Sequence, residues 1–381
     1  MKIKNLQKVA NRILKAIKQK EKIILYGDAD LDGVTSIIIL KETIKNLGSE
    51  ITAIYFPDRE TEGHGISQKG LSFLKKFSPA LFIVLDCGIG NFKEIKLANK
   101  IGFEVIVIDH HEVLDKLPEA EIIVDPKQRG DKYPFKKLAT AGISFKLSEL
   151  LLKEKMSQNL RKNFLELVAI ATIADMMPQV NENKTFIVGG LKSLERSFRP
   201  GIRAFFETDF LKNYNLLQKV SKMISILNVR DVEDNLPISF RLLTLSSFKT
   251  AKEIILKLKE KTETRKEEIE KIIEEVKERI LRKEGPILFE GDLAWNFSLI
   301  SPVASNLCQK FKKPVFVFKK LKEESQGTVR TPLRIDSVAL MKKCKKYLIT
   351  YGGHPQASGF RIKNKDLEKF KKCLINHFTR H

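Results

Sequence analysis

The chain has 381 residues, of which 43% are hydrophobic and 30% are charged, a composition typical of globular proteins. Its length predicts two or three domains, and no apolar run reaches the about 20 residues that a membrane-spanning helix requires. The net charge of +22 favours a polyanionic ligand, usually nucleic acid, although lysine enrichment in heat-adapted proteins would also explain such a charge.

The N-terminal segment is basic, but its apolar residues fall at helical spacing, which predicts a first helix rather than a signal peptide. We therefore expect a cytoplasmic protein that does not contact membranes. The four cysteines are scattered and form no CxxC pair, so we expect neither a disulfide framework nor a structural zinc site. These cysteines are Cys87, Cys308, Cys344 and Cys373.

The first half of the chain alternates short apolar runs with helical patterns. Strands are expected at residues 23–26, 51–56, 81–85, 105–108 and 122–124. Helices are expected between them at residues 34–46, 68–76 and 92–100, and after them at 141–153, 160–174 and 184–196. This order of strands and helices predicts a mostly parallel sheet with helices on its faces.

The second half begins with a break at Arg199-Pro200-Gly201. Residues 249–284 contain no glycine or proline and predict one helix of roughly 50 Å, either a spacer between domains or a coiled-coil arm. After Gly285-Pro286, strands are expected at residues 287–290, 315–319 and 326–330, with helices at 301–311, 335–346 and 365–378. This pattern predicts a second α/β domain.

Acidic residues and histidines follow the predicted strands at their carboxyl ends, where open α/β sheets bind ligands. One further segment, the apolar helix before Asp175, ends similarly. The residues are Asp28, Asp30 and Asp32 after the first strand, Asp86 after the third, Asp109, His110 and His111 after the fourth, and Asp175.

Unpaired carboxylates gathered in a dry cleft are costly, and a pair of divalent cations removes that cost. Carboxylates with one imidazole suit Mn²⁺ or Mg²⁺, and two such ions activate a water molecule and clamp a phosphate. Any single aspartate after a strand is more often a turn or cap residue, and an isolated DxDxDG resembles a calcium loop. Four such segments together favour the metal site.

The combined motifs resemble the DHH phosphoesterase superfamily and, within it, the RecJ-like nucleases. The motifs are GDADLDGVTS at residues 27–36, DCGIG at 86–90, DHH at 109–111 and the aspartate of TIADMMP at 172–178. The connecting segments 57–67, 125–147 and 199–207 are also similar to those of RecJ proteins. GTVRTP at 327–332 and GGHPQASGF at 352–360 resemble the associated DHHA1 domain.

This resemblance implies an α/β fold with a parallel-sheet DHH domain and a smaller α/β DHHA1 domain joined by a long helix. The implied divisions are residues 1–200 for the DHH catalytic domain, 201–285 for a helical extension with the long linker helix, and 286–381 for the DHHA1 substrate-binding domain. The DHHA1 domain would hold a nucleic-acid strand against the metal site, which would explain exonuclease action and rejection of a duplex.

The resemblance also implies roles for the acidic cluster. Two cations, with Mn²⁺ favoured and Mg²⁺ as the alternative, would be held by Asp28, Asp30, Asp32, Asp86, His110 and Asp175. Asp86 would bridge the cations, whereas Asp28 would either bind one directly or support a ligand. Asp109 would orient a neighbouring histidine. His111 would face the scissile phosphate and stabilise its charge or assist the leaving oxygen.

The segment around Gly352 and Gly353 has features of a phosphate cradle. Glycines let the backbone approach a ligand closely, and successive N–H groups form an anion-binding concavity. His354 would add a polar or cationic contact, and Arg330 could bind phosphate through two hydrogen bonds. The alternative is an ordinary glycine-rich turn.

Other positions remain without an assigned role. Residues 227–231 resemble a shortened RecJ element, and we assign no role to Asn228 or Arg230. Trp295 is expected in the core rather than stacked on a base. Asn296 stands where RecJ relatives usually carry a histidine.

The expected function is a two-metal exonuclease that is specific for single strands, DNA first with RNA open, and releases 5′-mononucleotides in DNA repair, recombination or replication. A 5′→3′ polarity is favoured, with 3′→5′ open. The chain is short for a bacterial RecJ and has no segment for an OB-fold, so it resembles the compact archaeal type, whose partners include the GINS complex or a repair helicase. The alternatives are a nanoRNase or cyclic-dinucleotide phosphodiesterase, which would not need a charge of +22, and a Cdc45-like replication scaffold, which would have eroded motifs.

Overall fold

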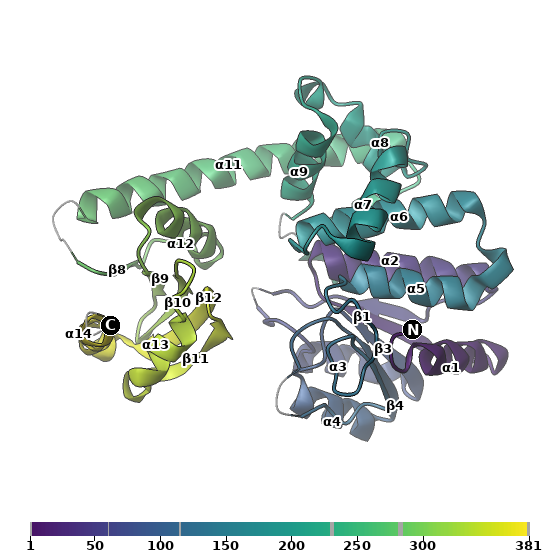
Figure 1. The fold of residues 1–381 in the computed structure, drawn as a ribbon, viewed down its shortest axis with the longest axis horizontal. Helices are drawn as coiled ribbons and strands as arrows, with labels where there is room; N and C mark the ends of the chain where they lie inside the picture. The colour runs from purple at the N-terminus through teal and green to yellow at the C-terminus, as the bar shows by residue number, and fades with distance from the viewer. Residues whose placement is uncertain (1, 60, 114–115, 229–231, 281–284, 379–381) are drawn as a thin grey trace. The chain divides into compact units, whose positions relative to one another are not determined.

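The computed structural model describes residues 2–59, 61–113, 116–228, 232–280 and 285–378, apart from the side chains of Val232, Glu233 and His354. The chain divides into two compact units, residues 1–259 and 260–381 (Figure 1). Within the described ranges, no helix combines the length and the apolar character that crossing a membrane would require.

The first unit is built on a five-stranded parallel sheet of order β2-β1-β3-β4-β5. The strands are β1 (Ile23–Gly27), β2 (Ala53–Tyr55), β3 (Ala80–Leu85), β4 (Phe103–Ile108) and β5 (Ile122–Val124). The helices around this sheet are α1 (Leu6–Lys18), α2 (Leu31–Asn46), α3 (Gln68–Leu74), α4 (Phe92–Ile101) and α5 (Thr140–Leu152). The predicted parallel sheet is therefore confirmed.

Helices cover both faces of this sheet, with α2 and α5 on one face and α3 and α4 on the other (Figure 1). Along β1, Ile23 and Leu25 pack with the first pair of helices, whereas Ile24 and Tyr26 pack with the second. Because neither face meets water, the strand is apolar throughout, which is why it reads as an unbroken hydrophobic run.

A helical region completes the first unit. It comprises α6 (Gln158–Ala174), α7 (Asn181–Leu194), α8 (Pro200–Phe206), α9 (Leu216–Leu227) and α10 (Ile238–Thr244), with a hairpin of β6 (Val232–Glu233) and β7 (Leu236–Pro237). The break predicted at Pro200 is the start of α8, because proline is favoured in the first turn of a helix. Arg199 ties this region to α2 through Glu42, with nitrogen–oxygen distances of 2.9 and 2.7 Å.

The long helix predicted for residues 249–284 is α11 (Phe248–Ile280), which begins in the first unit and ends in the second. Its early apolar residues, Ala251, Ile255 and Leu258, pack in the core of the first unit. Ile272 and Val276 pack in a core of the second unit. Each end of the helix therefore has its own apolar contacts, which a solvated spacer would lack.

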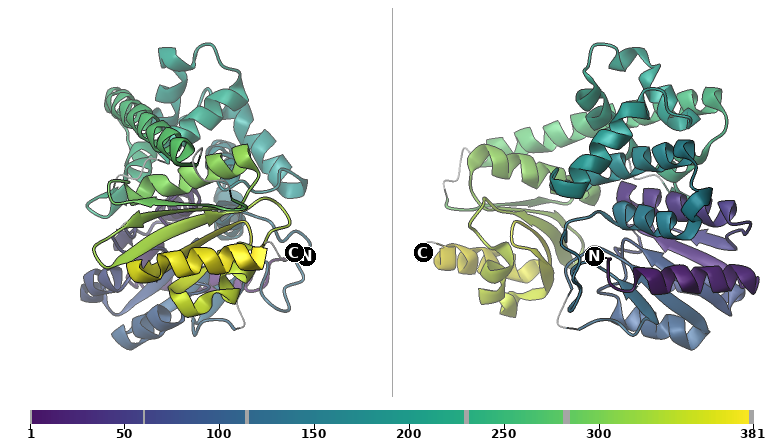
Figure 2. Two further views of the ribbon diagram at one scale, coloured as in Figure 1. Left: turned by 90° about the vertical axis from the view of Figure 1, so that its left-hand side faces the viewer. Right: turned by 45° about the vertical axis from the view of Figure 1, so that its right-hand side comes forward.

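The second unit contains a five-stranded mixed sheet of order β11-β12-β10-β9-β8, in which only the pair β8–β9 is parallel among the described strands. The strands are β8 (Leu288–Asp292), β9 (Val315–Lys320), β10 (Glu324–Arg330), β11 (Leu348–His354) and β12 (Ala357–Lys363). The helix α12 (Phe297–Phe311) covers one face, and α13 (Ser337–Lys343) and α14 (Leu367–Phe378) cover the other (Figure 2). This confirms the second α/β domain.

The sequence analysis did not predict β11 and β12. Gly352, Gly353 and Gly359 lie in these strands, and glycine disfavours strand structure in any local pattern. Pairing with β10 stabilises the hairpin through contacts that are distant in sequence. The cradle segment is therefore the end of a β-hairpin and not an isolated turn.

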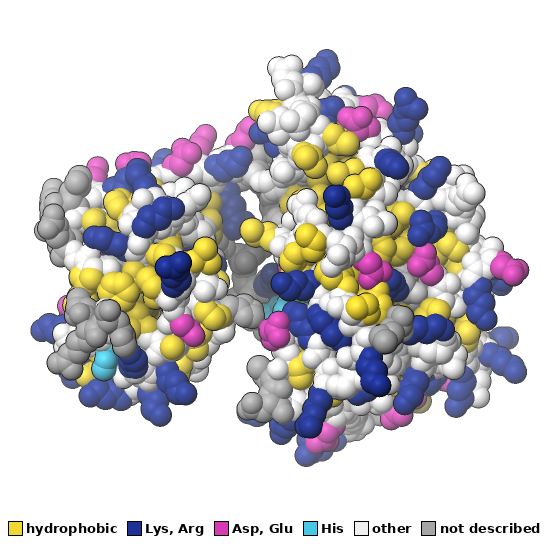
Figure 3. Space-filling model, in the orientation of Figure 1, with side chains coloured by type: hydrophobic (Ala, Val, Ile, Leu, Met, Phe, Trp, Pro, Cys, Tyr) yellow, Lys and Arg dark blue, Asp and Glu magenta, His cyan; other side chains and the backbone are white. Residues whose placement is uncertain are grey.

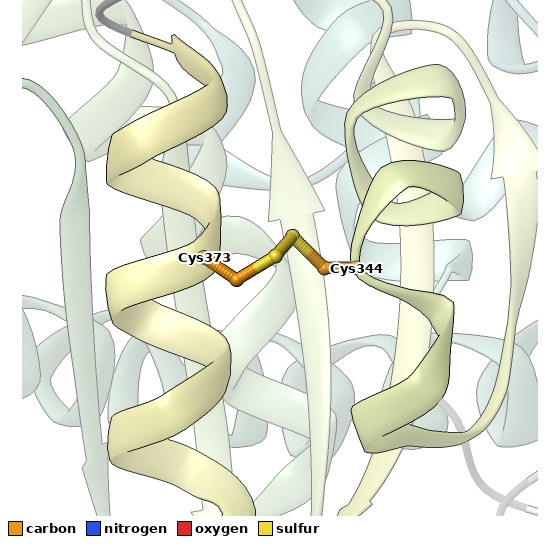
Figure 4. The surroundings of a disulfide bond; sticks show 2 residues. All are labelled: Cys344 and Cys373. Carbon is orange, nitrogen blue, oxygen red and sulfur yellow. A yellow bond between two sulfur atoms is a disulfide. The ribbon is translucent and has the colours of Figure 1, made fainter.

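One disulfide links Cys344, at the end of α13, to Cys373 in α14, with Cα atoms 6.0 Å apart (Figure 4). The sequence analysis, which expected no disulfide framework, did not predict this bond. The two residues are 29 positions apart, and only the packing of both helices on one face of the sheet brings them together. Cys87 and Cys308 are free and buried.

We predict opposite effects of alanine at two glycines that each occupy the third position of a helix. A Cβ atom at Gly33 in α2 would lie 2.3 Å from the backbone oxygen of Asp28, whereas at Gly142 in α5 the nearest atom, in the ring of Phe186, is 3.5 Å away. Gly33→Ala should lower the free energy of unfolding by about 2 kcal/mol or more. Gly142→Ala should raise it by up to about 1 kcal/mol. Urea denaturation measures both, and equal stabilities would contradict the close approach at Gly33.

Candidate metal centre

The carboxyl ends of three adjacent strands place acidic residues at one edge of the parallel sheet. Asp28 follows β1, Asp86 follows β3 and Asp109 follows β4, in the order in which these strands lie in the sheet. Asp175, the residue that ends α6, lies at the same edge, because its carboxylate is 3.5 Å from His110. The structure therefore brings together the acidic residues that the sequence analysis selected.

Three overlapping groups of side chains could each hold a metal ion, since their ligand atoms lie within 4.8 Å of one another. Asp86 and His110 each belong to two of these groups, so they lie at the centre of the cluster. The groups are Asp28 with Asp30 and Asp86, Asp32 with His110 and Asp175, and Asp86 with His110 and His111.

The start of α2 fixes two of these aspartates. Asp30 is the N-cap of the helix, and its carboxylate accepts hydrogen bonds from the backbone N–H groups of Asp32 and Gly33 at 3.0 and 3.1 Å. Asp28 is fully buried and accepts from the N–H of Ala29 at 2.8 Å. Helix capping therefore orients Asp30 before any cation binds.

Asp32 is held by the start of a different helix. Its two carboxylate oxygens accept from the N–H groups of Thr140 and Ala141, at 2.7 and 2.8 Å, in the first turn of α5. The Thr140 hydroxyl also donates to Asp86 at 3.0 Å. The sequence analysis noted the segment 125–147 only as a similarity and missed Thr140, whose contact with the cluster spans more than a hundred residues.

Two further residues that the sequence analysis missed contact the cluster from the loop after β2. The Arg59 side chain donates from Nε to Asp28 at 2.7 Å and from Nη2 to Asp30 at 2.9 Å. His64 Nδ1 lies 3.1 Å from Asp28, and its ring packs edge-on against His111. Both residues belong to the segment 57–67. The sequence signal that could have identified them is a basic residue and a histidine in the loop after β2, the strand that pairs with β1.

His110 occupies the middle of the cluster. Its Nε2 atom lies 3.3 Å from Asp86, 3.5 Å from Asp175 and 3.8 Å from Asp32. Burial lowers the pKa of His110 to about 3, so the ring is neutral near pH 7 and Nε2 is available as a metal ligand.

Asp86 has a left-handed backbone conformation, with φ of +62°, which is uncommon for residues other than glycine. Such conformations persist where the surrounding structure imposes them, and they concentrate at functional sites. The conformation turns the chain directly after β3 while the carboxylate remains buried next to Thr140 and His110.

Asp109 contacts His111 as the predicted orienting role requires. Its carboxylate accepts from His111 Nδ1 at 2.8 Å and from the N–H groups of His110 and Ile89 at 2.7 and 3.1 Å. Burial alone would raise the pKa of Asp109, but the hydrogen bond from His111 and the nearby positive charges lower it well below its usual value. Burial lowers the pKa of His111 less than the bond to Asp109 raises it, so the pKa of His111 lies above its usual value.

The remaining carboxylates retain an unbalanced negative charge. Burial and repulsion from neighbouring acids raise the pKa of Asp32 to about 8, the pKa of Asp175 to about 6 and that of Asp86 well above its usual value. One buried oxygen of Asp175 has no hydrogen-bond partner among the described residues. Divalent cations with a preference for oxygen and imidazole ligands would neutralise this charge and satisfy this oxygen, so the residues fit Mn²⁺ or Mg²⁺.

The predicted substrate-binding residues lie in the second unit. Gly352 and Gly353 are in β11, and Gly352 lines a hollow of about 350 Å³ beside Phe297 and Tyr351. His354 ends β11, and its side chain lies outside the described part of the chain. Arg330 ends β10 and donates to Ser301, Ser305, Thr328 and the oxygen of Val329, so most of its donors are already engaged within the unit.

The softer positions of the sequence analysis have different surroundings. Trp295 is buried and donates to Glu275 at 2.9 Å, so its placement in the core is confirmed. Asn296 caps α12 by accepting from the N–H of Ser298. Asn228 is exposed at the end of α9, and Arg230 lies outside the described residues.

We predict that the metal-free protein loses stability as the pH rises from 6.5 to 8. The pKa of Asp32 is about 8 in the folded chain, against about 3.9 for a free carboxyl, so the folded state binds more protons than the unfolded state in this window. The lowered pKa of His110 makes stability rise with pH, but only below pH 6.5, the ordinary pKa of histidine, so it does not affect this window.

Thermal unfolding in a chelator should show Tm falling across this window. Mn²⁺ should raise Tm more at pH 8 than at pH 6.5, because protons then compete less for the ligands. In Asp32→Asn, both the fall of Tm with pH and the pH dependence of the Mn²⁺ effect should be smaller. An equal increase in Tm with Mn²⁺ at both pH values would contradict a cation site made of these carboxylates.

The chain matches two family models, and the matched segments correspond to the two sheet-containing regions of the structure. Residues 22–172 match the model of the DHH family, N-terminal domain, and residues 284–379 match the model of the DHHA1 domain. The first match contains the first parallel sheet with its acidic edge, and the second contains the mixed sheet with the β11–β12 hairpin.

Relatives with the same organisation are nucleases by name. The single-stranded-DNA-specific exonuclease RecJ of Bacillus subtilis is 32% identical over 382 residues, covering 98% of this chain and 47% of that protein. The RecJ exonuclease of Haemophilus influenzae is 27% identical, covering 96% of this chain and 68% of that protein. The chain thus spans about half the length of the first relative and about two thirds of the second.

Solved structures agree with this comparison. A crystal structure of exonuclease RecJ bound to manganese superimposes with a TM-score of 0.83 at 25% identity, covering 100% of this chain and 96% of that chain. RecJ of Thermus thermophilus in complex with Mn²⁺ has a TM-score of 0.84 at 23% identity, with 55% of its chain covered. The chain therefore contains an N-terminal domain of the DHH family and a DHHA1 domain, on a fold similar to that of the RecJ exonucleases.

Proposed function

We propose that the protein is a divalent-metal-dependent exonuclease that hydrolyses phosphodiester bonds of single-stranded nucleic acid and releases 5′-mononucleotides. The observation that carries this proposal is the set of overlapping carboxylate and imidazole groups at the edge of the parallel sheet. The names of the relatives support single-stranded DNA as the first substrate. The RecJ structures with Mn²⁺ and Mg²⁺ support these ions as cofactors.

Six residues would hold two such cations, with Mn²⁺ favoured: Asp28, Asp30, Asp32, Asp86, His110 and Asp175. When bound, the cations supply a nucleophile from water at neutral pH and neutralise charge on the phosphate. Arg59 is hydrogen-bonded to Asp28 and Asp30, so its guanidinium would stabilise these carboxylates or, on moving, contact a phosphate oxygen of the strand.

Among the residues that the structure describes at this site, His111 is the best suited to donate a proton to a reacting oxygen. Its side chain is 36% exposed, whereas His110 is buried, so His111 can reach a substrate. The hydrogen bond from Nδ1 to Asp109 fixes the ring and leaves Nε2 facing away from Asp109. The pKa of His111 lies above its usual value, which favours the protonated ring that stabilises the phosphate or protonates the leaving oxygen.

The DHHA1 unit would bind the strand. Gly352 lines the hollow and has no side chain, and the space where its Cβ atom would lie is open. A phosphate in the hollow could therefore approach the backbone of Gly352. Arg330 would contribute positive charge near β10, and His354 is proposed as a further contact. Lysine and arginine side chains are spread over both units on the face shown in Figure 3, and the net charge of +22 would attract a polyanionic strand.

The finer features of this proposal rest on the resemblance of the sequence motifs to those of the RecJ-like nucleases. We place the activity in DNA repair, recombination or replication, with 5′→3′ polarity and the GINS complex or a repair helicase as partners. The alternatives that the experiment below tests are RNA as a second substrate and 3′→5′ polarity. A scaffold without catalysis would not need the complete acidic cluster.

We predict that the protein with Mn²⁺ removes label as a mononucleotide from the 5′ end of single-stranded DNA. The test compares oligonucleotides labelled at either end, as DNA and as RNA, and a duplex of the same sequence. Asp86→Asn should lower the cleavage rate by more than about 100-fold, because loss of a residue that only supports a metal ligand already costs about 10–100-fold. Glu112→Gln is the matched control, because this exposed acid next to His111 pairs only with Lys127 among the described residues.

The outcomes separate the candidate functions. Label released only from the 3′ end would reverse the proposed polarity. Cleavage of dinucleotides without cleavage of long strands would identify the nanoRNase or cyclic-dinucleotide class. No cleavage with any divalent cation would contradict the catalytic role of the cluster.

We also predict that Asp109→Asn lowers kcat by about 10–100-fold while the affinity for Mn²⁺ changes little. The reason is that Asp109 bonds to His111 and to backbone N–H groups, and not to the atoms proposed to hold cations. Single-turnover rates at saturating Mn²⁺ measure the first effect, and metal titration of Tm measures the second. Equal loss of Mn²⁺ affinity in Asp109→Asn and Asp86→Asn would show that Asp109 acts as a ligand.

A further inference from the structure

A second hollow lies in the first unit, between the start of α6 and the end of α7, with a volume of about 370 Å³. This volume falls within the range of small-ligand sites. Asn163 lines it, twelve residues before Asp175 on the same helix, a separation of about 18 Å along the helix axis. The hollow is therefore distinct from the metal centre.

The floor of this hollow carries two hydrogen-bond acceptors. Glu166 is only 3% exposed, and its carboxylate accepts from the hydroxyl of Ser197. The side-chain oxygen of Asn163 is buried and finds no hydrogen-bond partner among the described residues. Because a buried acceptor without a partner is unfavourable, rotation of the Asn163 amide toward the hollow would present its oxygen to a ligand that offers N–H donors.

The rim combines an aromatic ring with positive charge. Phe198 is 84% exposed, and its ring contacts neither an aromatic ring nor a cation among the described residues. Lys162 and Arg196 also line the hollow, and neither forms an ion pair with a described carboxylate. Exposed phenylalanine beside unpaired cations is the combination with which proteins stack a base and bind a phosphate.

We propose that this hollow binds a nucleotide, with its base stacked on Phe198, N–H donors of the base directed to Asn163 and Glu166, and its phosphate near Lys162 and Arg196. Guanine fits best, because its N1–H and N2–H groups are neighbouring donors on one edge. A cationic side chain would be repelled by Lys162 and Arg196. A purely apolar ligand would leave the side-chain oxygen of Asn163 without a partner.

The nucleotide has two sources with the same chemistry, a base within a bound strand or a free mononucleotide such as a hydrolysis product. Either source makes the hollow a second nucleotide site remote from the scissile bond. Binding there does not require the cations, so it is tested separately from the proposed nuclease activity.

The test is calorimetric titration of the full chain with GMP, IMP and AMP in a chelator, which prevents cation-mediated binding of phosphate at the metal centre. We expect saturable binding of GMP and weaker binding of IMP, which lacks the N2 donors. Phe198→Ala should weaken GMP binding about tenfold or more, the loss expected for one stacked base. Leu217→Ala, a truncation of another exposed apolar side chain in the same unit, is the matched control.

Further variants distinguish the contacts. Arg196→Ala should weaken the binding of GMP more than the binding of guanosine. Lys192 is an exposed residue of α7 outside the hollow, so Lys192→Ala should change the binding of neither ligand. Glu166→Gln should reduce the preference for GMP over AMP. Because Glu166 is buried, the Tm of Glu166→Gln is measured as well. If this variant does not fold, the proposal is tested by Phe198→Ala.

A strand of thymidines with one guanine separates the two sources. If it binds more tightly than an all-thymidine strand and the difference disappears in Phe198→Ala, the site reads a strand; if only free GMP binds at Phe198, the site takes the mononucleotide. No saturable GMP binding, or GMP binding that Phe198→Ala leaves unchanged, would overturn the proposal. Cleavage of a thymidine oligonucleotide by the wild-type protein with Mn²⁺ is measured separately from GMP binding, so failure of the nuclease activity would be recognised independently.

Discussion

Repulsion among buried carboxylates at one edge of the parallel sheet is the constraint on which the rest of this structure depends. Asp32, Asp86 and Asp175 lie close together with little solvent, and their raised pKa values measure the unfavourable energy of that arrangement. The chain tolerates it because backbone N–H groups, Arg59 and Thr140 supply partial compensation. The charge that remains is the reason why we propose this site for divalent cations.

The scaffold holds these groups in place with little freedom. Both faces of the sheet are covered by helices, so the strands that carry Asp28, Asp86 and Asp109 are buried along their length. The starts of α2 and α5 then direct N–H groups at Asp30 and Asp32. Because packing of the whole unit fixes these elements, the proposed ligands are already oriented without a cation, which would lower the entropy lost on binding.

The parallel sheet and its acidic edge could be predicted from the sequence because both signals are local. Each strand is an apolar run, and each acidic residue directly follows one. Arg59, His64 and Thr140 were missed because their contacts with the cluster join segments far apart in the chain, and the local similarity of their segments to RecJ proteins does not single them out. The β11–β12 hairpin and the disulfide were missed for the same reason, since pairing with β10 and packing of α13 against α14 create them.

The left-handed backbone at Asp86 has a consequence for natural variation at this position. Glycine and asparagine tolerate such a conformation, and each differs from aspartate by a single nucleotide in the codon. Both replacements remove the central carboxylate while preserving the turn after β3. Chains with either replacement would therefore keep their fold without the carboxylate proposed to hold cations, and if the protein binds strands as proposed, such chains would compete with the intact protein for the same substrate.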